Sequence, residues 1–453
     1  MNKILQIMFK QVDNSQLIIF RIFFGLLMLL ESWGAIATGW VKEAFIVPKQ
    51  TFTFIGFEWT EVLLGEFMYF YYIVMGIMGI LIMLGYRYRL ACISFFTLWG
   101  LTYFMQKSHY NNHYYLVWLI SGFMAIIPAH KYHSLDVKRN PSLKQNWTQY
   151  WTVFIFQFQI AIVYVYASIA KLYPGWLENK FLALRLKRAA KWFRNELSWD
   201  TYANFLELES VQYFQVYAGI FFDLLVVPML LFKRTRTIAL IATLTFHLAN
   251  SITLQIGIFP YFAIAFAVFF YPRQRIQQLF FKSKTFYNDL KSQICLSQNN
   301  KIGLGLISLY FLIQLILPIR HWFIEDNVLW TEEGHRLSWR MMLRTKGSHS
   351  FYFEYVDLES NTRKKINKYD YATNRQLRVA ATKPDMIWQL LQRIEADFEA
   401  KGIKYDELYA HSKVSVNGGK YYPLIDSNYN LKNIKWNTFT HQDWILKCPE
   451  EYN

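Results

Sequence analysis

Apolar segments of membrane length recur through the first 320 residues of the chain and then stop. A helix of about 20 apolar residues crosses the roughly 30 Å hydrocarbon core of a bilayer. The pattern predicts nine spans, at about residues 17–38, 67–86, 90–106, 114–129, 150–176, 211–232, 237–254, 257–271 and 303–318. We therefore expect a mainly α membrane protein, in which residues 1–319 form a bundle of about nine transmembrane helices.

Two segments between these spans follow other patterns. Residues 41–66 mix Pro48 with aromatic residues, which is typical of an interfacial or re-entrant segment. Residues 177–210 contain the basic run FLALRLKRAAKWF, whose alternation of apolar and cationic positions is typical of a helix that lies on a membrane surface.

The composition becomes polar after Pro318. The alternating run SFYFEYVDL predicts a strand, and Pro384 to Lys401 predicts a helix with proline in its first turn. Val414 to Ile425 predicts a strand–turn–strand unit around Gly418-Gly419. We expect residues 320–453 to form a small, β-rich extramembrane domain.

The formal net charge of +16 fits a membrane protein rather than a nucleic-acid-binding protein. If the N-terminus is cytoplasmic, four basic loops all face the cytoplasm, at about residues 87–89, 130–149, 233–236 and 272–300. Nine spans then place the C-terminal domain outside the cytoplasm. We expect no cleavable signal peptide. We expect a bacterial inner-membrane protein with a periplasmic domain; the same orientation toward the endoplasmic-reticulum lumen is the alternative.

Lys171 stands near the end of the fifth predicted span, shortly before Pro174-Gly175. A lysine inside a span costs about 3 kcal/mol on insertion scales, so it should face protein or a water-filled cavity. A desolvated lysine can act as a neutral amine base. The alternative is a lysine that reaches the headgroups and anchors the end of the helix.

Further polar residues are expected at the depth of Lys171. Asn111, Asn112 and His113 begin the fourth span, where they could orient a substrate and move charge, or simply cap a helix. His247 and Asn250 share a helix face, where they could line a pocket or satisfy other helices.

Other polar residues point to less specific roles. Asp223 could compensate a buried cation, but the span positions place it deeper than Lys171 and favour a structural role. Cys92, Cys295 and Cys448 form no CxxC pair, and the histidines have no ligand spacing. We therefore expect no metal.

Several segments together resemble the vitamin K-dependent γ-glutamyl carboxylases, from about residue 15 to 430. These segments are KSHYNNHYYL (107–116), FQFQIAIVYVYASIAKL (156–172), FHLANSITLQIGIFPY (246–261), NVLWTEEGHRLSWRMML (327–343) and KPDMI (383–387). The resemblance implies a helical membrane bundle with a luminal β-rich domain. It also implies an enzyme that couples oxygenation of vitamin K hydroquinone to its epoxide with carboxylation of peptide glutamate. Vitamin K hydroquinone would be the cofactor, O2 and CO2 the co-substrates, and a glutamate-containing protein the partner.

The resemblance also implies roles for individual residues. Lys171 matches the catalytic lysine that deprotonates the hydroquinone, and His113 the histidine of the carboxylation step. We expect the cofactor-binding residues to be Asn112, His247 and Asn250. Asn111, Trp330 and His335 are expected to support the site.

This sequence departs from the family pattern at several positions. Ala170 stands where the family has the first of two lysines, His335 replaces a common tyrosine, and the luminal region is short. These differences affect the expected recognition of the protein substrate more than the expected binding of the quinol. Two other functions therefore stay open: a quinol epoxidase without glutamate carboxylation, and a non-catalytic membrane scaffold or transporter.

Overall fold

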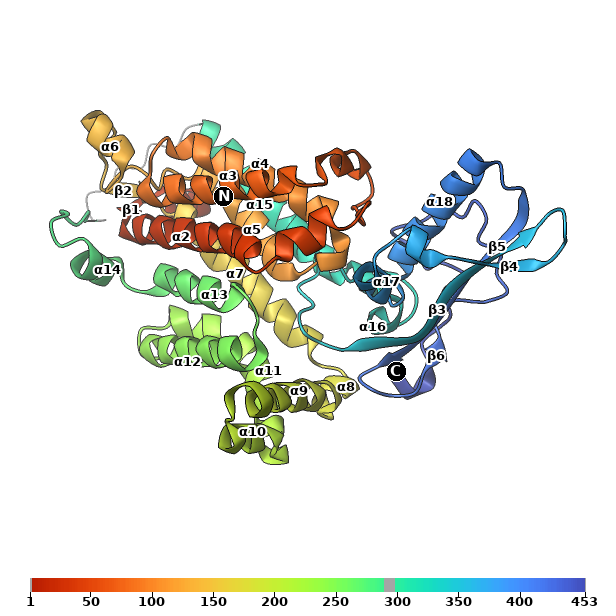
Figure 1. Ribbon diagram of the computed structural model, residues 1–453. Helices are drawn as coiled ribbons and strands as arrows, with labels where there is room; N and C mark the ends of the chain where they lie inside the picture. Colours follow the sequence, from red (N-terminus) through yellow and green to blue (C-terminus); the bar gives the residue numbers. More distant parts are fainter. Residues whose placement is uncertain (1, 289–297, 453) are drawn as a thin grey trace.

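The structure is a computed structural model that describes residues 2–288 and 298–452. A helical bundle is followed by a C-terminal region with a small sheet (Figure 1). Within the described residues, six helices are long and apolar enough to cross a membrane. They are α2 (Ser15–Ala37), α3 (Phe67–Leu84), α7 (Trp151–Ala170), α11 (Glu209–Leu231), α12 (Arg236–Leu254) and α15 (Gln298–Ile319) with its 3-10 continuation to Phe323.

The predicted count of nine spans is not confirmed. The other three predicted segments are helical, as α4 (Tyr88–Met105), α5 (Asn112–Ile126) and α13 (Phe259–Phe266) with a 3-10 turn (Ala267–Phe270). They are shorter or less apolar than the six helices above. The predicted surface segment forms α9 (Lys180–Leu197) and α10 (Asp200–Glu207), and α9 buries one apolar face in the fold.

Chain segments that are far apart in sequence meet at one end of the bundle. The short strand β1 (Gln11–Asp13) pairs with β2 (Trp147–Gln149), and Lys284 forms a fully buried ion pair with Asp13. The backbone N–H of Arg87 donates to Asp136 at 2.8 Å. Parts of three predicted basic loops therefore lie together, as expected for loops on one side of a membrane.

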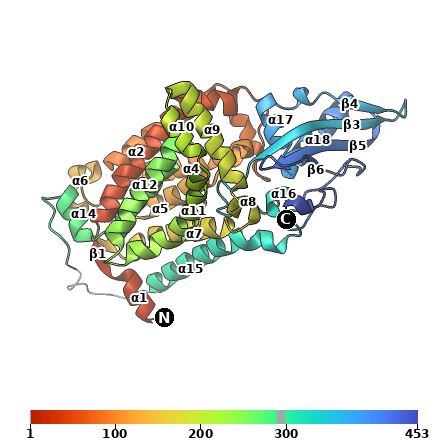
Figure 2. The same ribbon diagram turned by 90° about the horizontal axis from the view of Figure 1, so that it is seen from below.

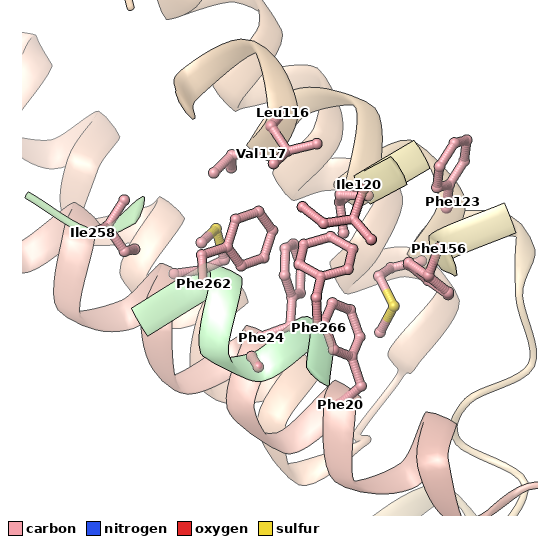
Figure 3. Packing of buried hydrophobic residues seen from close by; sticks show 14 of the residues in the cluster. Phe20, Phe24, Leu116, Val117, Ile120, Phe123, Phe156, Ile258, Phe262 and Phe266 are labelled. Atoms are coloured by element: carbon pink, nitrogen blue, oxygen red, sulfur yellow. The ribbon is translucent and has the colours of Figure 1, made fainter. Parts of the chain in front are cut away.

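Aromatic side chains and small residues hold the bundle together. The ring of Phe20 in α2 packs against the rings of Phe156 in α7 and Phe266 in α13 (Figure 3). Gly25 and Gly79 mark the crossing of α2 and α3, where an added Cβ would lie only 2.4 Å from Met83 N or 2.7 Å from Leu29 N. Close approach of backbones at small residues is a common way to pack membrane helices.

The C-terminal region contains an antiparallel sheet in the order β4-β3-β5-β6. Its strands are β3 (Lys346–Asp357), β4 (Arg363–Ile366), β5 (Tyr405–Val416) and β6 (Tyr422–Pro423). Helices α17 (Asn374–Ala380) and α18 (Pro384–Lys401) accompany the sheet, and α18 has the predicted bounds. The turn after β5 has left-handed backbone at Asn417 and Gly418, close to the predicted turn.

A buried carboxylate joins the C-terminal region to the bundle. Asp385, in the first turn of α18, accepts hydrogen bonds from Lys107 Nζ at 2.8 Å and Arg336 Nη1 at 2.7 Å. Trp339 is fully buried and stacks on Tyr115 of α5 at 5.0 Å between ring centroids. The segment from residue 336 to 344 is therefore packed into the end of the bundle.

We expect Asp385→Asn to lower the free energy of unfolding by about 3–5 kcal/mol, because it leaves two buried cations without their carboxylate. Burial alone would raise the pKa of Asp385, but Arg336 and Lys107 lower it from 3.8 to about 2. The carboxylate therefore contributes stability that is present above about pH 4 and is lost as the pH falls through about 2. Thermal unfolding in detergent measures both effects.

Asp397→Asn on the same helix is the control for this substitution. Asp397 pairs with the exposed Lys401, and such a surface pair contributes about 0.5 kcal/mol or less. A melting temperature for Asp385→Asn equal to that of wild type would contradict the structural role given to the buried carboxylate.

Candidate functional site

An apolar cavity of about 490 Å³ lies between α7, α11 and α12, and the hairpin of α9 and α10 contributes to its wall. The structure brings four of the predicted site residues to this cavity. They are His113, Lys171, His247 and Asn250. They come from three separate segments, at residues 112–126, 151–171 and 236–254, so the tertiary fold and not the local sequence assembles the site.

Lys171 is the C-cap residue of α7, and Pro174 starts the next short helix. Its Nζ donates a very short hydrogen bond to Asp223 Oδ2 of α11, and both side chains are about nine-tenths buried. The span positions predict a deeper place for Asp223 than for Lys171 and favour a structural role, but the two side chains meet. The reason is the length of the lysine side chain, which extends from the helix end to the carboxylate.

Gly219 lies beside this contact. It lies one helical turn before Asp223 on the same face of α11. A Cβ at Gly219 would lie 3.6 Å from Trp176 Cζ2 and 4.0 Å from Lys171 Cε. The Lys171 Nζ also lies 5.4 Å from the centre of the Trp176 ring, in the position of a cation–π contact.

Phe259 separates the two histidines of the cavity. His113 stacks on Phe259 with ring centroids 4.3 Å apart, and its ring forms no hydrogen bond within the described residues. His247 packs edge-on against the same phenyl ring at 5.7 Å. Its Nε2 lies 2.8 Å from the hydroxyl of Tyr164. His247 is therefore fixed by a partner, whereas His113 keeps its ring nitrogens available.

A second cavity, of about 380 Å³, lies between the start of α5 and the C-terminal region. It is strongly cationic, with five cationic side chains and one carboxylate. These are Arg340, Arg344, Lys346, Arg378, Lys383 and Glu332. Three predicted site residues, Asn111, Asn112 and His335, line this cavity and not the apolar one.

The charges of the cationic cavity are only partly compensated. Glu332 contacts Arg344 and lies 3.4 Å from Lys346 Nζ. Burial would raise the pKa of Glu332, but Arg344 and neighbouring lysines hold it well below 4.5. Arg378 and Lys383 form no ion pair within the part of the chain that the structure describes. The cavity is therefore suited to an anionic ligand.

His335 is neutral at pH 7, because burial and the nearby Arg344 hold the pKa of its imidazole well below 6.5. Its Nδ1 is buried and has no hydrogen-bond partner in the described chain. Asn111 accepts from the backbone N–H of Tyr114 and is the N-cap of α5. Asn112 accepts from Tyr110 and donates to the Arg340 carbonyl at 3.1 Å. Asn112 thus holds the C-terminal segment against α5, and Asn111 caps the helix.

The two cavities share a wall. His113, Met341 and Met342 line both of them. The segment that supplies the methionines has left-handed backbone at three non-glycine residues, with φ of 59° at Leu337, 56° at Trp339 and 48° at Met342. Such conformations are costly and cluster at functional sites.

Trp330 lines neither cavity. It is fully buried in the core of the C-terminal region, and its Nε1 donates to the Leu446 carbonyl at 2.8 Å. Its own carbonyl accepts from Lys346 Nζ at 2.6 Å, so it supports the cationic cavity indirectly. Cys92 and Cys448 are free thiols, and Cys295 lies outside the described residues.

Comparison with known protein families agrees with this arrangement. Residues 9–274, more than half of the chain, match the model of the HTTM domain, and residues 299–451 match that of the vitamin K-dependent gamma-carboxylase, lumenal domain. The apolar helices indicate a multi-pass membrane protein. The match to a lumenal domain indicates that the C-terminal domain is of an extracytoplasmic kind. The chain belongs to the HTTM-domain proteins and, within them, to the vitamin K-dependent gamma-carboxylase family. No solved structure matches the chain.

We predict that binding of a small dicarboxylate such as glutarate weakens roughly tenfold as the pH rises from 7 to 9. Burial lowers the pKa of Lys346 to about 8, against the opposing effect of Glu332. Lys346 therefore loses its proton in this range, and the cavity loses positive charge. Isothermal titration in detergent measures the affinity.

In Lys346→Met the affinity should be lower at pH 7 and almost independent of pH. Lys413→Met, at an exposed position of β5, should behave as wild type. Equal affinities of the wild-type protein at pH 7 and pH 9 would show that Lys346 does not set the charge of this cavity.

Proposed function

We propose that this protein couples oxygenation of a vitamin K-type hydroquinone to carboxylation of peptide glutamate. One observation carries the proposal: an apolar cavity with a buried acid–base pair and a cationic cavity meet at His113. A hydroquinone requires the first environment, and a glutamate side chain requires the second. The family assignment, which makes the protein a carboxylase-type membrane protein, supports the same reaction.

The residues of the apolar cavity fit a hydroquinone ring. Its wall is formed largely by aromatic and aliphatic side chains, and the few polar groups are suited to quinol oxygens. Lys171, Asp223, His247 and Asn250 would hold the hydroxyl groups. Phe214 of α11 and Ala249 of α12 line the cavity and are also exposed on the bundle surface, so an isoprenoid tail can extend toward lipid. The hydroquinone, when bound, supplies with O2 the strong base that no side chain can provide.

The protein side chains act mainly on protons and water. The Lys171–Asp223 pair is placed to take the proton of a quinol hydroxyl, a step within the range of side-chain bases. The surrounding aromatic wall excludes water from the product of that step. His113, which reaches both cavities and has free ring nitrogens, is placed to hold or move a proton in the carboxylation step.

The cationic cavity is the proposed glutamate site. Arg340 and Lys383 supply charge for the carboxylate of the substrate and for the second carboxylate that CO2 adds. His335, where relatives of this family are expected to have tyrosine, lies in the same cavity and can donate or accept one hydrogen bond. The glutamate would reach His113 from the side of the C-terminal region.

The proposed membrane arrangement follows from these sites. We infer a division near residue 319/320, with the quinol site in the bundle and the glutamate site at its contact with the C-terminal domain. The basic loops would lie in the cytoplasm and the C-terminal domain in the periplasm of a bacterium. Under this arrangement the partner is a secreted or surface protein that carries glutamate.

An assay of both half-reactions tests the proposal. Purified protein receives vitamin K hydroquinone, O2, labelled bicarbonate and a glutamate-rich peptide, and epoxide and acid-stable label are measured together. We expect both products from wild type. Lys171→Met should lower both by at least about 100-fold. His113→Ala should lower label more than epoxide, because this residue serves the second step.

Lys187→Met, on the exposed face of α9, is the matched control and should retain both activities. Epoxide without label from wild type would favour a quinol epoxidase that does not carboxylate glutamate. Absence of epoxide from folded wild type, with quinol bound, would refute the proposed reaction and favour a scaffold or transporter.

A further inference from the structure

A small polar cavity lies among α2, α3, α4 and α5, and it shares no lining residue with the apolar or the cationic cavity. Its volume is about 20 Å³, which is room for about one water molecule. Three of its lining residues can hold or move a proton: Glu31 of α2, Tyr103 of α4 and His109 in the turn before α5. The proposed reaction has so far given none of them a role.

Several polar atoms around this cavity have no partner. Tyr103 is 6% exposed, and its hydroxyl group forms no hydrogen bond within the described residues. The same is true of the buried Nε2 of His109. Glu31 accepts a hydrogen bond from the Tyr114 hydroxyl at 2.6 Å through its Oε1. Buried polar groups are normally bonded to protein or to ordered water, so these groups fit a bound water molecule.

The surroundings favour neutral groups in this cavity. Glu31 forms no ion pair in the part of the chain that the structure describes, and the rings of Trp40, Tyr72 and Trp99 line the same space. A carboxylate without a cation is costly at such a place, so the neutral acid is the resting form. His109 is also neutral at pH 7, because burial lowers the pKa of its imidazole to about 4. A neutral acid beside water can release a proton to one side and take up another from the other side.

One side of the small cavity faces the cationic cavity through two tyrosines. The ring centroids of Tyr103 and Tyr110 lie 6.1 Å apart. Tyr110 lines the cationic cavity, and its hydroxyl donates to Asn112 Oδ1 at 2.7 Å. Asn112 directly precedes His113, so hydroxyl groups lead from the proposed glutamate site to the small cavity.

The other side leads to the surface. The ring of His109 packs edge-on against Trp40 at 5.3 Å between centroids. Arg375 and Glu43 lie close enough to His109 to affect the pKa of its ring. These two residues form an ion pair whose side chains are 41% and 49% exposed. His109 therefore stands between the small cavity and solvent.

The proposed reaction leaves a proton that has to be removed from the site. The hydroquinone gives two protons, and the γ-carbon of glutamate gives one. The oxygen atom that does not enter the epoxide takes two of them and becomes water, whereas CO2 takes none when it becomes the new carboxylate. One proton is therefore left after each turnover. The five cationic side chains of the glutamate site oppose its release through that cavity.

We propose, on the basis of this reaction, that the small cavity at Glu31 conducts the surplus proton to the surface. The proton passes from the hydroxyl of Tyr110 to that of Tyr103 and on to a water molecule in the cavity. Glu31 releases its own proton toward His109 and solvent and takes up the incoming one. Each O–H or N–H bond that breaks is replaced by one that forms, so no group on the route keeps a charge after the turnover.

Glu31→Gln tests the route, because the amide can still accept from Tyr114 but cannot pass on a proton. At low buffer concentration and with saturating substrates, we expect epoxide and label to fall together by about tenfold, with the KM of hydroquinone and of peptide unchanged. Imidazole, a small proton carrier, should restore both products to within about twofold of wild type. A variant that only disturbs the structure would not be restored by a proton carrier.

Tyr103→Phe separates proton conduction from stability. Removal of a buried hydroxyl without a partner breaks no hydrogen bond, so the melting temperature should stay the same or rise. Turnover should nevertheless fall by about fivefold and be restored by imidazole. Tyr71→Phe is the matched control, because the Tyr71 hydroxyl donates to the Leu98 carbonyl at 2.7 Å and does not line the cavity. This control should lower the melting temperature and keep turnover.

Infrared spectroscopy gives a readout that does not depend on turnover. At pH 7 we expect a carbonyl band of a carboxylic acid that is missing in Glu31→Gln and that shifts promptly when H2O is replaced by D2O. No such band, a band that exchanges only over hours, or loss of turnover that imidazole does not restore would each overturn the route. Wild-type turnover in both Glu31→Gln and Tyr103→Phe would overturn it as well. Wild type that shows the exchanging band but forms no epoxide would instead refute the proposed reaction, and the surplus proton with it.

Discussion

Asp385 between Lys107 and Arg336 is the interaction on which the site depends. A single buried carboxylate compensates one cation from the bundle and one from the C-terminal region. This contact fixes the position of the C-terminal region against the bundle. The segment after Arg336 is then packed into the end of the bundle, where Trp339 is fully buried. Figure 2 shows α15 running beside α7 to this same end, from which the chain enters the C-terminal region.

The contact at Asp385 places two different environments, an apolar cavity and a cationic cavity, next to each other. In the proposed reaction, removal of a quinol proton needs an apolar space with a local acid–base pair, whereas binding of glutamate needs uncompensated positive charge. The bundle supplies the first and the C-terminal region supplies the second. Met341 and Met342 stand between them together with His113, and the soft, flexible side chains of methionine can adapt to ligands on both sides.

Much of the fold could be predicted from the sequence, because long apolar runs and strand alternation are local signals. The bounds of α18 and the strand around Phe353 follow from such signals. The predicted count of nine spans is not confirmed, because α4, α5 and α13 do not reach the combined length and apolarity of the other six helices. An apolar run in a sequence does not fix where its helix begins and ends.

The site was predictable only in part. The resemblance pointed to Lys171, His113 and His247 as site residues, and the alternation of the helices predicted them at one depth, in agreement with the single cavity that they line. The contact between Lys171 and Asp223 was missed because a sequence gives the depth of a backbone position but not the reach of a long side chain. The cationic cavity was missed because its arginines and lysines lie on separate loops and strands that only the tertiary fold brings together.

A cryo-EM structure with both a quinone analogue and a glutamate peptide bound would test most directly whether two cavities meeting at His113 form the active centre. The account predicts the quinone ring in the apolar cavity beside Lys171 and Asp223, and the glutamate side chain in the cationic cavity near Arg340 and Lys383, with His113 between them. Density for the ring or for the glutamate at any other place in the molecule would contradict it.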